Sequence, residues 1–394
     1  MEPLFWLLLP AAALSGWLIG RGGERGERTT QRGDDHRPQY FRGLNYLLNE
    51  QPDKAIEVFV RMAEIDADTA ETHLALGSLF RRRGEVERAI RVHQNLIARP
   101  SLSREQRVLA LLALGEDYLR AGLLDRAESL FRETIDAGLH VDRALAHLLD
   151  IYQQEREWEQ AIDVAVRLDQ GNHRHAGDKP MGPIIAQLRC ELAQQAHDVG
   201  QNGTARQHLR AALRADPRCV RASILDGRWA MEAGQYAQAL KALQQVRQQD
   251  VDYLPEVLAP MRACYQALGR EAQFEDYLRS VQYEYDGVSL LLMLADAVRA
   301  RQGDAAAIEY LITQLGRRPS VRGLNRLLEL ILENRPAAPD AGFDVLSGLF
   351  AELLRTKPGY GCGECGFTGR QLHWQCPGCR SWGSIKPIHG VEGE

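Results

Sequence analysis

Four cysteines near the C-terminal end of the sequence have the residue type and spacing of a metal site. Cys362 and Cys365 form one C-x-x-C turn, and Cys376 and Cys379 form a second turn after a short loop. A C-x-x-C turn directs two thiolates at one centre, and two such turns complete a tetrahedral cage. Because protein would fill all four positions, we expect a structural ion rather than a catalytic one.

Glycines inside and beside these turns, Gly363, Gly366 and Gly378, are expected to supply the positive φ angles of a tightly bent backbone. Thiolate cages take either zinc or iron, and we favour zinc while iron remains possible. The alternative interpretation, a pair of redox dithiols, fits less well because two C-x-x-C units at this spacing are typical of zinc sites.

The composition of the whole chain limits the class of protein. Its 394 residues are 45% hydrophobic and 26% charged, enough to bury a large core or several modules. A formal net charge of −5 gives no basic excess, which argues against nucleic acid as the main partner. The other cysteines, Cys190, Cys219 and Cys264, are scattered over apparently helical segments. They are predicted to be buried small hydrophobic residues in a reducing compartment, without a disulfide framework.

The chain begins with an uncharged apolar segment, Leu4–Gly20. As a helix it would measure about 25 Å, at the short end of what crosses a bilayer. A cleaved signal peptide is the alternative, but its positive charge should precede the apolar run, whereas here the arginines follow it. Since positive charge stays in the cytoplasm, we predict a transmembrane anchor over residues 1–21, with a periplasmic N-terminus. Residues 22–39, rich in Gly, Arg and Asp, are predicted to form a flexible cytoplasmic tether.

Small residues recur at intervals of 34 from residue 40 onward. Gly43 and Gly77 are each followed three residues later by an aromatic residue and twelve residues later by an alanine. Small residues on both helices of a hairpin let the two helices approach closely. The same register recurs at Gly115, Tyr118, Ala127 and Phe131, at Leu149, Tyr152, Ala161 and Ala165, at Ala193, Ala205, Leu209 and Pro217, and at Gly227, Ala239 and Leu243.

This register resembles the tetratricopeptide repeat, a helix–turn–helix of 34 residues. Because no repeat buries its apolar face alone, we predict an all-α fold in which residues 40–356 form a stacked superhelical solenoid. The later repeats lose the glycine–aromatic pair, and we expect eight or nine helical pairs, ending with Asn325–Leu332 and Phe343–Leu354.

Two stretches, Pro100–Gln106 and Gly171–Pro183, interrupt the spacing. His173 and His175 in the second stretch lack an acidic or cysteine partner nearby, so we interpret them as solvated loop residues rather than metal ligands.

A solenoid of this kind offers a concave groove that usually binds extended peptides or partner helices. Tyr265, Tyr283 and Tyr285 are candidates for anchoring such a partner. Aromatic residues at helical spacing are more often part of the core, and this is the interpretation we favour.

The cysteine module, residues 357–394, is too small to hold much core of its own and should depend on metal for folding. Between the two turns Phe367, Leu372 and Trp374 alternate with polar residues, which predicts a short hairpin. We expect the aromatic side chains of the module to pack on the final helices of the solenoid.

The turns C-G-E-C-G and C-P-G-C resemble those of rubredoxin and of short zinc ribbons. Rubredoxin has a much longer loop between its turns, which argues against electron transfer through iron. Anchor, arginine-rich tether, repeats and cysteine turns in this order make the chain similar, over essentially its full length, to the lipopolysaccharide assembly protein B family of Gram-negative bacteria. The resemblance implies an inner-membrane adapter whose metal ligands are the four cysteines and which has no catalytic residues.

Members of that family work with the membrane AAA+ protease FtsH and promote destruction of the lipid A deacetylase LpxC, while an inner-membrane lipopolysaccharide sensor protein opposes them. The sequence agrees with a protein that is not an enzyme, because it contains no Walker loop, H-E-x-x-H or G-x-S-x-G motif.

Two other functions stay open from the residues alone. The first is a membrane-tethered helical scaffold with a nucleic-acid-binding zinc ribbon, in which Trp374 stacks on a base. Its phosphate contacts would come from basic residues near the cysteine turns, namely Lys357, Arg370, Arg380 and Lys386. The second is an electron carrier with iron in the cage.

Overall fold

The computed structural model describes residues 41–43, 45–46, 49, 51–65, 69–171, 180–334 and 341–394. Within these ranges no helix is both long and apolar enough to cross a membrane. The predicted anchor and tether, and the two histidines of the second interrupting stretch, lie outside the described residues.

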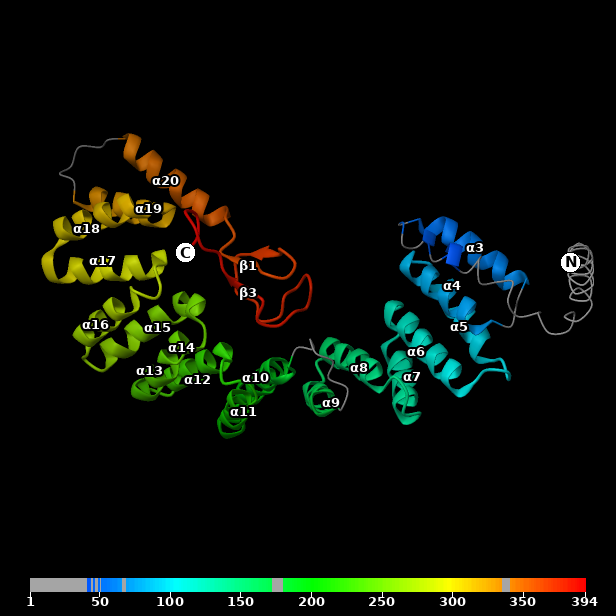
Figure 1. Cartoon of the computed structure of the whole chain (residues 1–394). Coiled ribbons are helices and arrows are strands. Elements are labelled where there is room, and N and C mark those ends of the chain that lie inside the picture. Colours follow the sequence, from blue (N-terminus) through cyan, green and yellow to red (C-terminus); the bar gives the residue numbers. More distant parts are fainter. Residues whose placement is uncertain are drawn as a thin grey trace, which may run out of the picture. The chain divides into compact units, whose positions relative to one another are not determined.

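Helices dominate the described chain, and they divide into two compact units with a boundary between Ile151 and Tyr152 (Figure 1). The first unit holds α3 (Pro52–Ile65), α4 (Ala70–Arg82), α5 (Val86–Ile97), α6 (Arg104–Arg120), α7 (Leu124–Asp136) and most of α8 (Val141–Glu155). The second unit begins with the end of α8 and continues with α9 (Trp158–Gln170), α10 (Gly182–Asp198), α11 (Asn202–Ala215), α12 (Val220–Glu232), α13 (Tyr236–Gln244), α14 (Val246–Gln249) and the 3-10 turn η3 (Val251–Tyr253). It ends with α15 (Leu254–Ala267), α16 (Glu271–Val281), α17 (Val288–Gln302), α18 (Asp304–Arg317), α19 (Val321–Glu333) and α20 (Ala341–Thr356), followed by the cysteine module.

The helical hairpins form as the small-residue register predicts. A Cβ atom added at Gly115 in α6 would lie 2.6 Å from the ring of Phe131 in α7, and one at Gly227 in α12 would lie 2.6 Å from Leu243 in α13. Carbon atoms do not approach that closely, so the glycines are what allows the paired helices to pack. From α4 to α20 the described residues hold eight such pairs, within the predicted number.

The interruptions of the repeat spacing change where helices begin. Ser103, inside the first interruption, caps α6: its hydroxyl accepts a hydrogen bond from the backbone N–H of Gln106, and the Gln106 side chain accepts one from the backbone N–H of Ser103. In the second interruption α9 ends at Gln170 and α10 begins at Gly182, so the last part of that stretch is already helical.

The core interpretation of the three tyrosines is right for two of them. Tyr265 and Tyr285 are buried, with 5% and 4% of their surface exposed, whereas Tyr283 is 96% exposed. Tyr283 follows the end of α16 in a turn, so helical spacing does not place it on the buried face. The three cysteines outside the module are buried as predicted.

The cysteine module contains a three-stranded antiparallel sheet in the order β2-β1-β3, formed by β1 (Tyr360–Cys362), β2 (Thr368–Gly369) and β3 (Ile385–Pro387). The predicted hairpin between the two cysteine turns is wrong. β2 pairs back with β1 across the first turn, because the metal-type turn reverses the chain there and the Cys362 N–H donates to the Phe367 carbonyl at 2.7 Å.

We predict that replacing Gly115 by alanine destabilises the first unit by about 1–3 kcal/mol, because the new methyl group overlaps the Phe131 ring. Thermal or urea unfolding followed by circular dichroism measures the change. Gly348→Ala is the matched control, since a Cβ there meets no atom within 4 Å and should stabilise helix α20 by about 0.5–1 kcal/mol. Equal destabilisation by both substitutions would contradict the packing argument.

Candidate metal centre

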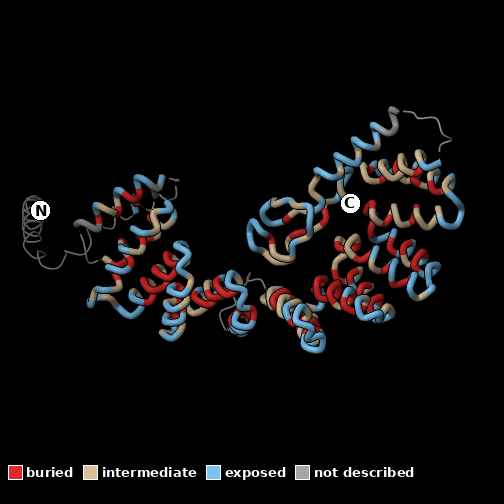
Figure 2. Tube along the Cα trace, turned by 180° about the vertical axis from the view of Figure 1, so that it is seen from behind, coloured by how far each residue is buried: buried red, intermediate tan, exposed pale blue. Residues whose placement is uncertain are grey.

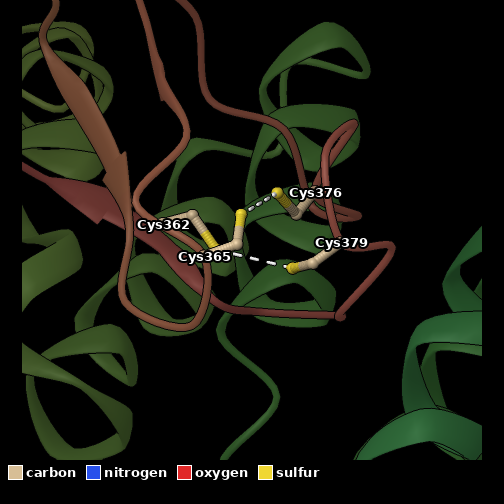
Figure 3. Close-up of side chains that lie close together, drawn as sticks. All are labelled: Cys362, Cys365, Cys376 and Cys379. Atoms are coloured by element: carbon tan, nitrogen blue, oxygen red, sulfur yellow. Dashed lines mark hydrogen bonds between the residues drawn. The ribbon is translucent and has the colours of Figure 1, made fainter. Parts of the chain in front are cut away.

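The structure brings the four predicted ligand atoms into one small volume (Figure 3). The Sγ atoms of Cys362, Cys365, Cys376 and Cys379 all lie within 4.8 Å of one another. Cys362 Sγ is 3.7 Å from Cys379 Sγ, and Cys365 Sγ is 3.6 Å from Cys376 Sγ. A tetrahedral ion with metal–sulfur bonds of about 2.3 Å requires sulfur atoms about 3.8 Å apart, so the cluster fits one structural metal ion.

The two cysteine turns have the same backbone geometry. The N–H of Gly366 donates to the Cys362 carbonyl at 3.1 Å, and the N–H of Arg380 donates to the Cys376 carbonyl at 2.8 Å. Both residues follow the second cysteine of their turn and both have positive φ, 75° at Gly366 and 60° at Arg380. Arg380 adopts this conformation without the freedom of glycine, which shows how strongly the turn requires it.

The expectation that three glycines supply positive φ is right for Gly366 and wrong for Gly363 and Gly378. Gly378 is needed for space instead, because a Cβ there would lie 3.3 Å from Cys365 Sγ. At Gly363 an added Cβ would make only an ordinary contact of 3.9 Å with the Ser384 carbonyl oxygen.

Hydrogen bonds favour the thiolate form of two of the cysteines. Cys362 Sγ lies 3.3 Å from Ser384 Oγ, and this hydrogen bond lowers the pKa of Cys362 to about 6. The hydroxyl and backbone N–H of Ser381 lower the pKa of Cys379 in the same way.

At Cys365 the crowding of sulfur atoms raises the thiol pKa instead of lowering it. A backbone hydrogen bond from Phe367 lowers its pKa, but desolvation and the three neighbouring thiols raise it to about 12. The four thiols therefore cannot all ionise side by side unless a cation compensates their charge, and this is the donor set that a thiophilic metal ion satisfies.

The cysteine module has almost no core of its own. Its buried cluster consists of Cys362, Cys376 and Ile385, and two of these three are candidate ligands. Most of the module is intermediate or exposed (Figure 2). The fold of the module therefore depends on whatever holds the sulfur atoms together.

Aromatic side chains dock the module on the helices, although not on the final helices as predicted. The ring of Trp374 stacks on Tyr253 of η3, with centroids 5.5 Å apart, and Trp382 meets the edge of Trp158 in α9 at 6.4 Å. The indole N–H of Trp382 also donates to Gln153 Oε1 at 2.6 Å. The prediction fails because η3 and the beginning of α9, not α19 or α20, present the aromatic surface.

Polar contacts hold the same face of the module. Lys386 in β3 forms ion pairs with Asp250 at 2.7 Å and Asp252 at 2.9 Å. Burial lowers the pKa of Lys386, but the two aspartates outweigh it and raise the pKa to about 12. The Tyr253 hydroxyl donates to the Ile385 carbonyl at 2.8 Å. Figure 1 shows the module, in red, beside the helices of the second unit.

Sequence reasoning missed several of the residues that shape this site. Ser384 lies in the same module and five positions after Cys379, but nothing in its spacing indicates a bond to Cys362. Tyr253 is more than a hundred residues from the module, and only the folded chain brings it to Trp374. Across the described ranges, the group of His, Cys, Asp and Glu side chains suited to a metal ion is the four-cysteine cluster.

Family models match three parts of the chain. A rubredoxin metal-binding domain matches residues 360–387, and tetratricopeptide repeats match residues 72–106 and 196–264.

The similarity to known proteins extends over the full length of the chain. The chain is 41% identical over 394 residues to lipopolysaccharide assembly protein B of Escherichia coli K12, covering 100% of both chains. It is 35% identical to the protein of the same name from Haemophilus influenzae, again covering 100% of both. Among solved structures, the crystal structure of MamA aligns with 45% of this chain and 95% of its own, at 17% identity and a TM-score of 0.34.

We predict that Ser384→Ala weakens metal binding about 10–100-fold, as loss of a partner of a metal ligand commonly does. The contact with the Ser384 hydroxyl lowers the Cys362 pKa, so its removal raises that pKa and lets protons compete with the metal at higher pH. Competition with a chromophoric chelator, repeated between about pH 5 and 8, measures both effects. Thr368→Ala removes an exposed hydroxyl from the same module and should change neither. An unchanged release profile in Ser384→Ala would refute the assigned role.

Proposed function

Because the chain belongs to the lipopolysaccharide assembly protein B family, we propose that it is an adapter that restrains lipopolysaccharide synthesis without chemistry of its own. In this proposal it delivers the lipid A deacetylase LpxC to the membrane protease FtsH, and an inner-membrane sensor protein opposes the delivery. The observation that carries the proposal is that the family relationship extends over the whole chain, repeats and cysteine module together.

The mechanism that we propose is tethering. Residues 1–21 anchor the chain in the inner membrane with the N-terminus in the periplasm, and residues 22–39 leave the repeats free to move near the cytoplasmic surface. Holding substrate and protease at one membrane surface raises their effective concentration, so degradation accelerates without any new catalytic group. The helical hairpins of residues 40–356 then supply binding surfaces.

The cysteine module, residues 357–394, acts as a structural part of the adapter in this proposal. Zinc held by Cys362, Cys365, Cys376 and Cys379 fixes the two turns, and iron is the alternative ion. With the turns fixed, Trp374 and Trp382 are presented to the helices as one rigid surface. Loss of the ion therefore should release the module from the helices rather than stop a reaction.

A nucleic-acid-binding ribbon on the same scaffold is less well supported. Trp374 is stacked on Tyr253, and Lys386 is paired with two aspartates, so neither side chain is available to a base or a phosphate in this conformation. Lys357 is likewise paired with Glu392 at 2.8 Å. Filter binding at low and moderate salt tests this function, because phosphate contacts weaken steeply as salt rises.

We predict that Cys362→Ser combined with Cys365→Ser abolishes metal binding and stabilises LpxC in cells. Two thiolates cannot close a tetrahedral cage, so the module detaches while the helices keep most of their circular dichroism signal. The measurement is the half-life of LpxC after translation arrest, in cells where this chain replaces the resident family member. The expected change is a half-life longer than with the unsubstituted chain.

Cys264→Ala is the matched control, because it removes a buried thiol outside the cage and should leave both metal content and LpxC half-life unchanged. In cells with an inactive FtsH, the double variant and the unsubstituted chain should give the same half-life. A double variant that still controls LpxC fully would remove the module from the mechanism.

A further inference from the structure

The last residues of the chain lie on helices of the final repeats, and His389 among them also contacts Asp252 at 3.6 Å and the Tyr285 ring at 5.9 Å. After β3, the Ile388 N–H donates to the Gly359 carbonyl at 2.9 Å, and the Val391 carbonyl accepts from the N–H of Val321, the first residue of α19, at 2.8 Å. The N–H of Glu394 closes the segment on itself by donating to the Ile388 carbonyl at 2.7 Å. We call residues 388–394 the tail.

The side-chain carboxylate of Glu394 is bound by four donors from the helices. Its Oε1 accepts from Ser289 Oγ at 2.6 Å and from the Arg322 guanidinium. Its Oε2 accepts from the Ser289 backbone N–H at 3.0 Å and from the Tyr285 hydroxyl at 3.2 Å. Ser289 is the second residue of α17, so this N–H has no partner within its own helix.

The donors form a receptor that the helices hold in place. Tyr285 is buried in the core of the second unit, and Arg322 also donates to Ser289 Oγ at 3.2 Å, which orients the hydroxyl toward the carboxylate. Burial and the neighbouring Glu394 carboxylate raise the pKa of Tyr285, so the hydroxyl keeps its proton and remains a donor. We call Tyr285, Ser289 and Arg322 the carboxylate receptor.

The tail itself is loosely packed, in contrast to its receptor. Val391 is 54% exposed, and the tail contains two glycines, Gly390 and Gly393. Cavities of about 740 Å³ and about 420 Å³ flank it, and Glu394 lines both of them. The side chain of Glu394 is only 8% exposed. Charge and hydrogen bonds therefore hold the tail with little apolar burial, chiefly at Glu394 and also through the pairs of Glu392 with Lys357 and of His389 with Asp252.

We propose that the carboxylate receptor is a binding site for acidic peptide segments and that the chain's own tail occupies it as an intramolecular ligand. A receptor built on packed helices and holding a loosely packed, acidic ligand is the arrangement in which a second peptide can compete. The occupant is a segment with a glutamate in the place of Glu394 and a second carboxylate in the place of Glu392, which pairs with Lys357 at 2.8 Å. The flanking cavities leave room for larger side chains than the tail carries.

Binding of such a segment displaces the tail and thereby removes one of the attachments of the cysteine module. Binding of an acidic partner at the receptor would thus change how firmly the cysteine module is attached to the helices. This inference does not depend on which protein is delivered for degradation, and its test needs neither protease nor deacetylase.

The test uses a labelled peptide in place of the tail. A fluorescent peptide of residues 389–394, amidated at its C-terminus, is added to the metal-loaded chain that lacks residues 389–394, and binding is followed by fluorescence anisotropy. We expect saturable binding that unlabelled peptide reverses. A peptide carrying E394Q should bind about 10-fold more weakly or worse, because it loses the charge in the hydrogen bonds. Equal binding of the two peptides overturns the proposal.

Variants of the receptor locate the site. Arg322→Gln in the shortened chain should reduce peptide binding at least about 10-fold, since it removes a charged donor. Arg326→Gln is the matched control on the same helix, because Arg326 pairs with Asp296 and Glu329 instead and does not contact the tail. If Arg322→Gln leaves peptide binding unchanged, the peptide binds elsewhere and the proposal is overturned.

The intact chain provides a second measurement in case the shortened chain folds poorly. The full-length E394Q chain keeps every residue but weakens its own tail, so the labelled peptide should bind it more tightly than it binds the unsubstituted chain. Hydrogen exchange of the tail amides should also be faster in E394Q. If E394Q changes neither peptide affinity nor tail exchange, the tail is not an intramolecular ligand of this receptor.

Discussion

Four sulfur atoms within one small volume are the constraint on which the rest of the cysteine module depends. Desolvation and the neighbouring thiols raise the pKa of Cys365 to about 12, and a bound cation would compensate the charge of its thiolate. The same four residues include two of the three side chains of the module's buried cluster. Ligation and folding should therefore be coupled in this module, and four thiolate ligands would leave the ion no open position.

The sulfur cluster also affects contacts outside the module, because the two cysteine turns set the positions of two tryptophans. Trp374 lies between the ring of Tyr253 and the guanidinium of Arg221, which is 6.0 Å from its ring centroid. Gly383, beside Trp382, lies next to Gln187 of α10, where an added Cβ would be 4.0 Å from the amide nitrogen. Gln187 and Arg221 sit near the beginning of first helices, which are the helices that line the groove of a repeat solenoid. In the second unit the chain's own module thus packs against first helices of the repeats.

The sequence patterns correctly predicted those features that depend on residues near one another in the chain. The 34-residue register placed Gly77 and Gly115 opposite the side chains they accommodate, and the C-x-x-C spacing placed four sulfurs together. The register did not explain His93, a polar residue at the position that Phe131 holds in the next hairpin. His93 is buried there because its Nδ1 bonds to Asp117 at 2.5 Å, and Asp117 in turn pairs with Arg81. Partners from two neighbouring helices, α4 and α6, make the polar residue acceptable, and no periodicity contains that information.

Contacts between distant segments explain why the module docks elsewhere than the sequence predicted. The docking of Trp374 on Tyr253 and of Trp382 on Trp158 joins residues more than a hundred positions apart, so the expectation of docking on the final helices rested only on nearness in sequence. The two attachments of the module also differ in physical character. The aromatic contacts of Trp374 and Trp382 bury apolar surface. The carboxylate of Glu394 is held by charge-assisted hydrogen bonds, which another carboxylate can replace one for one.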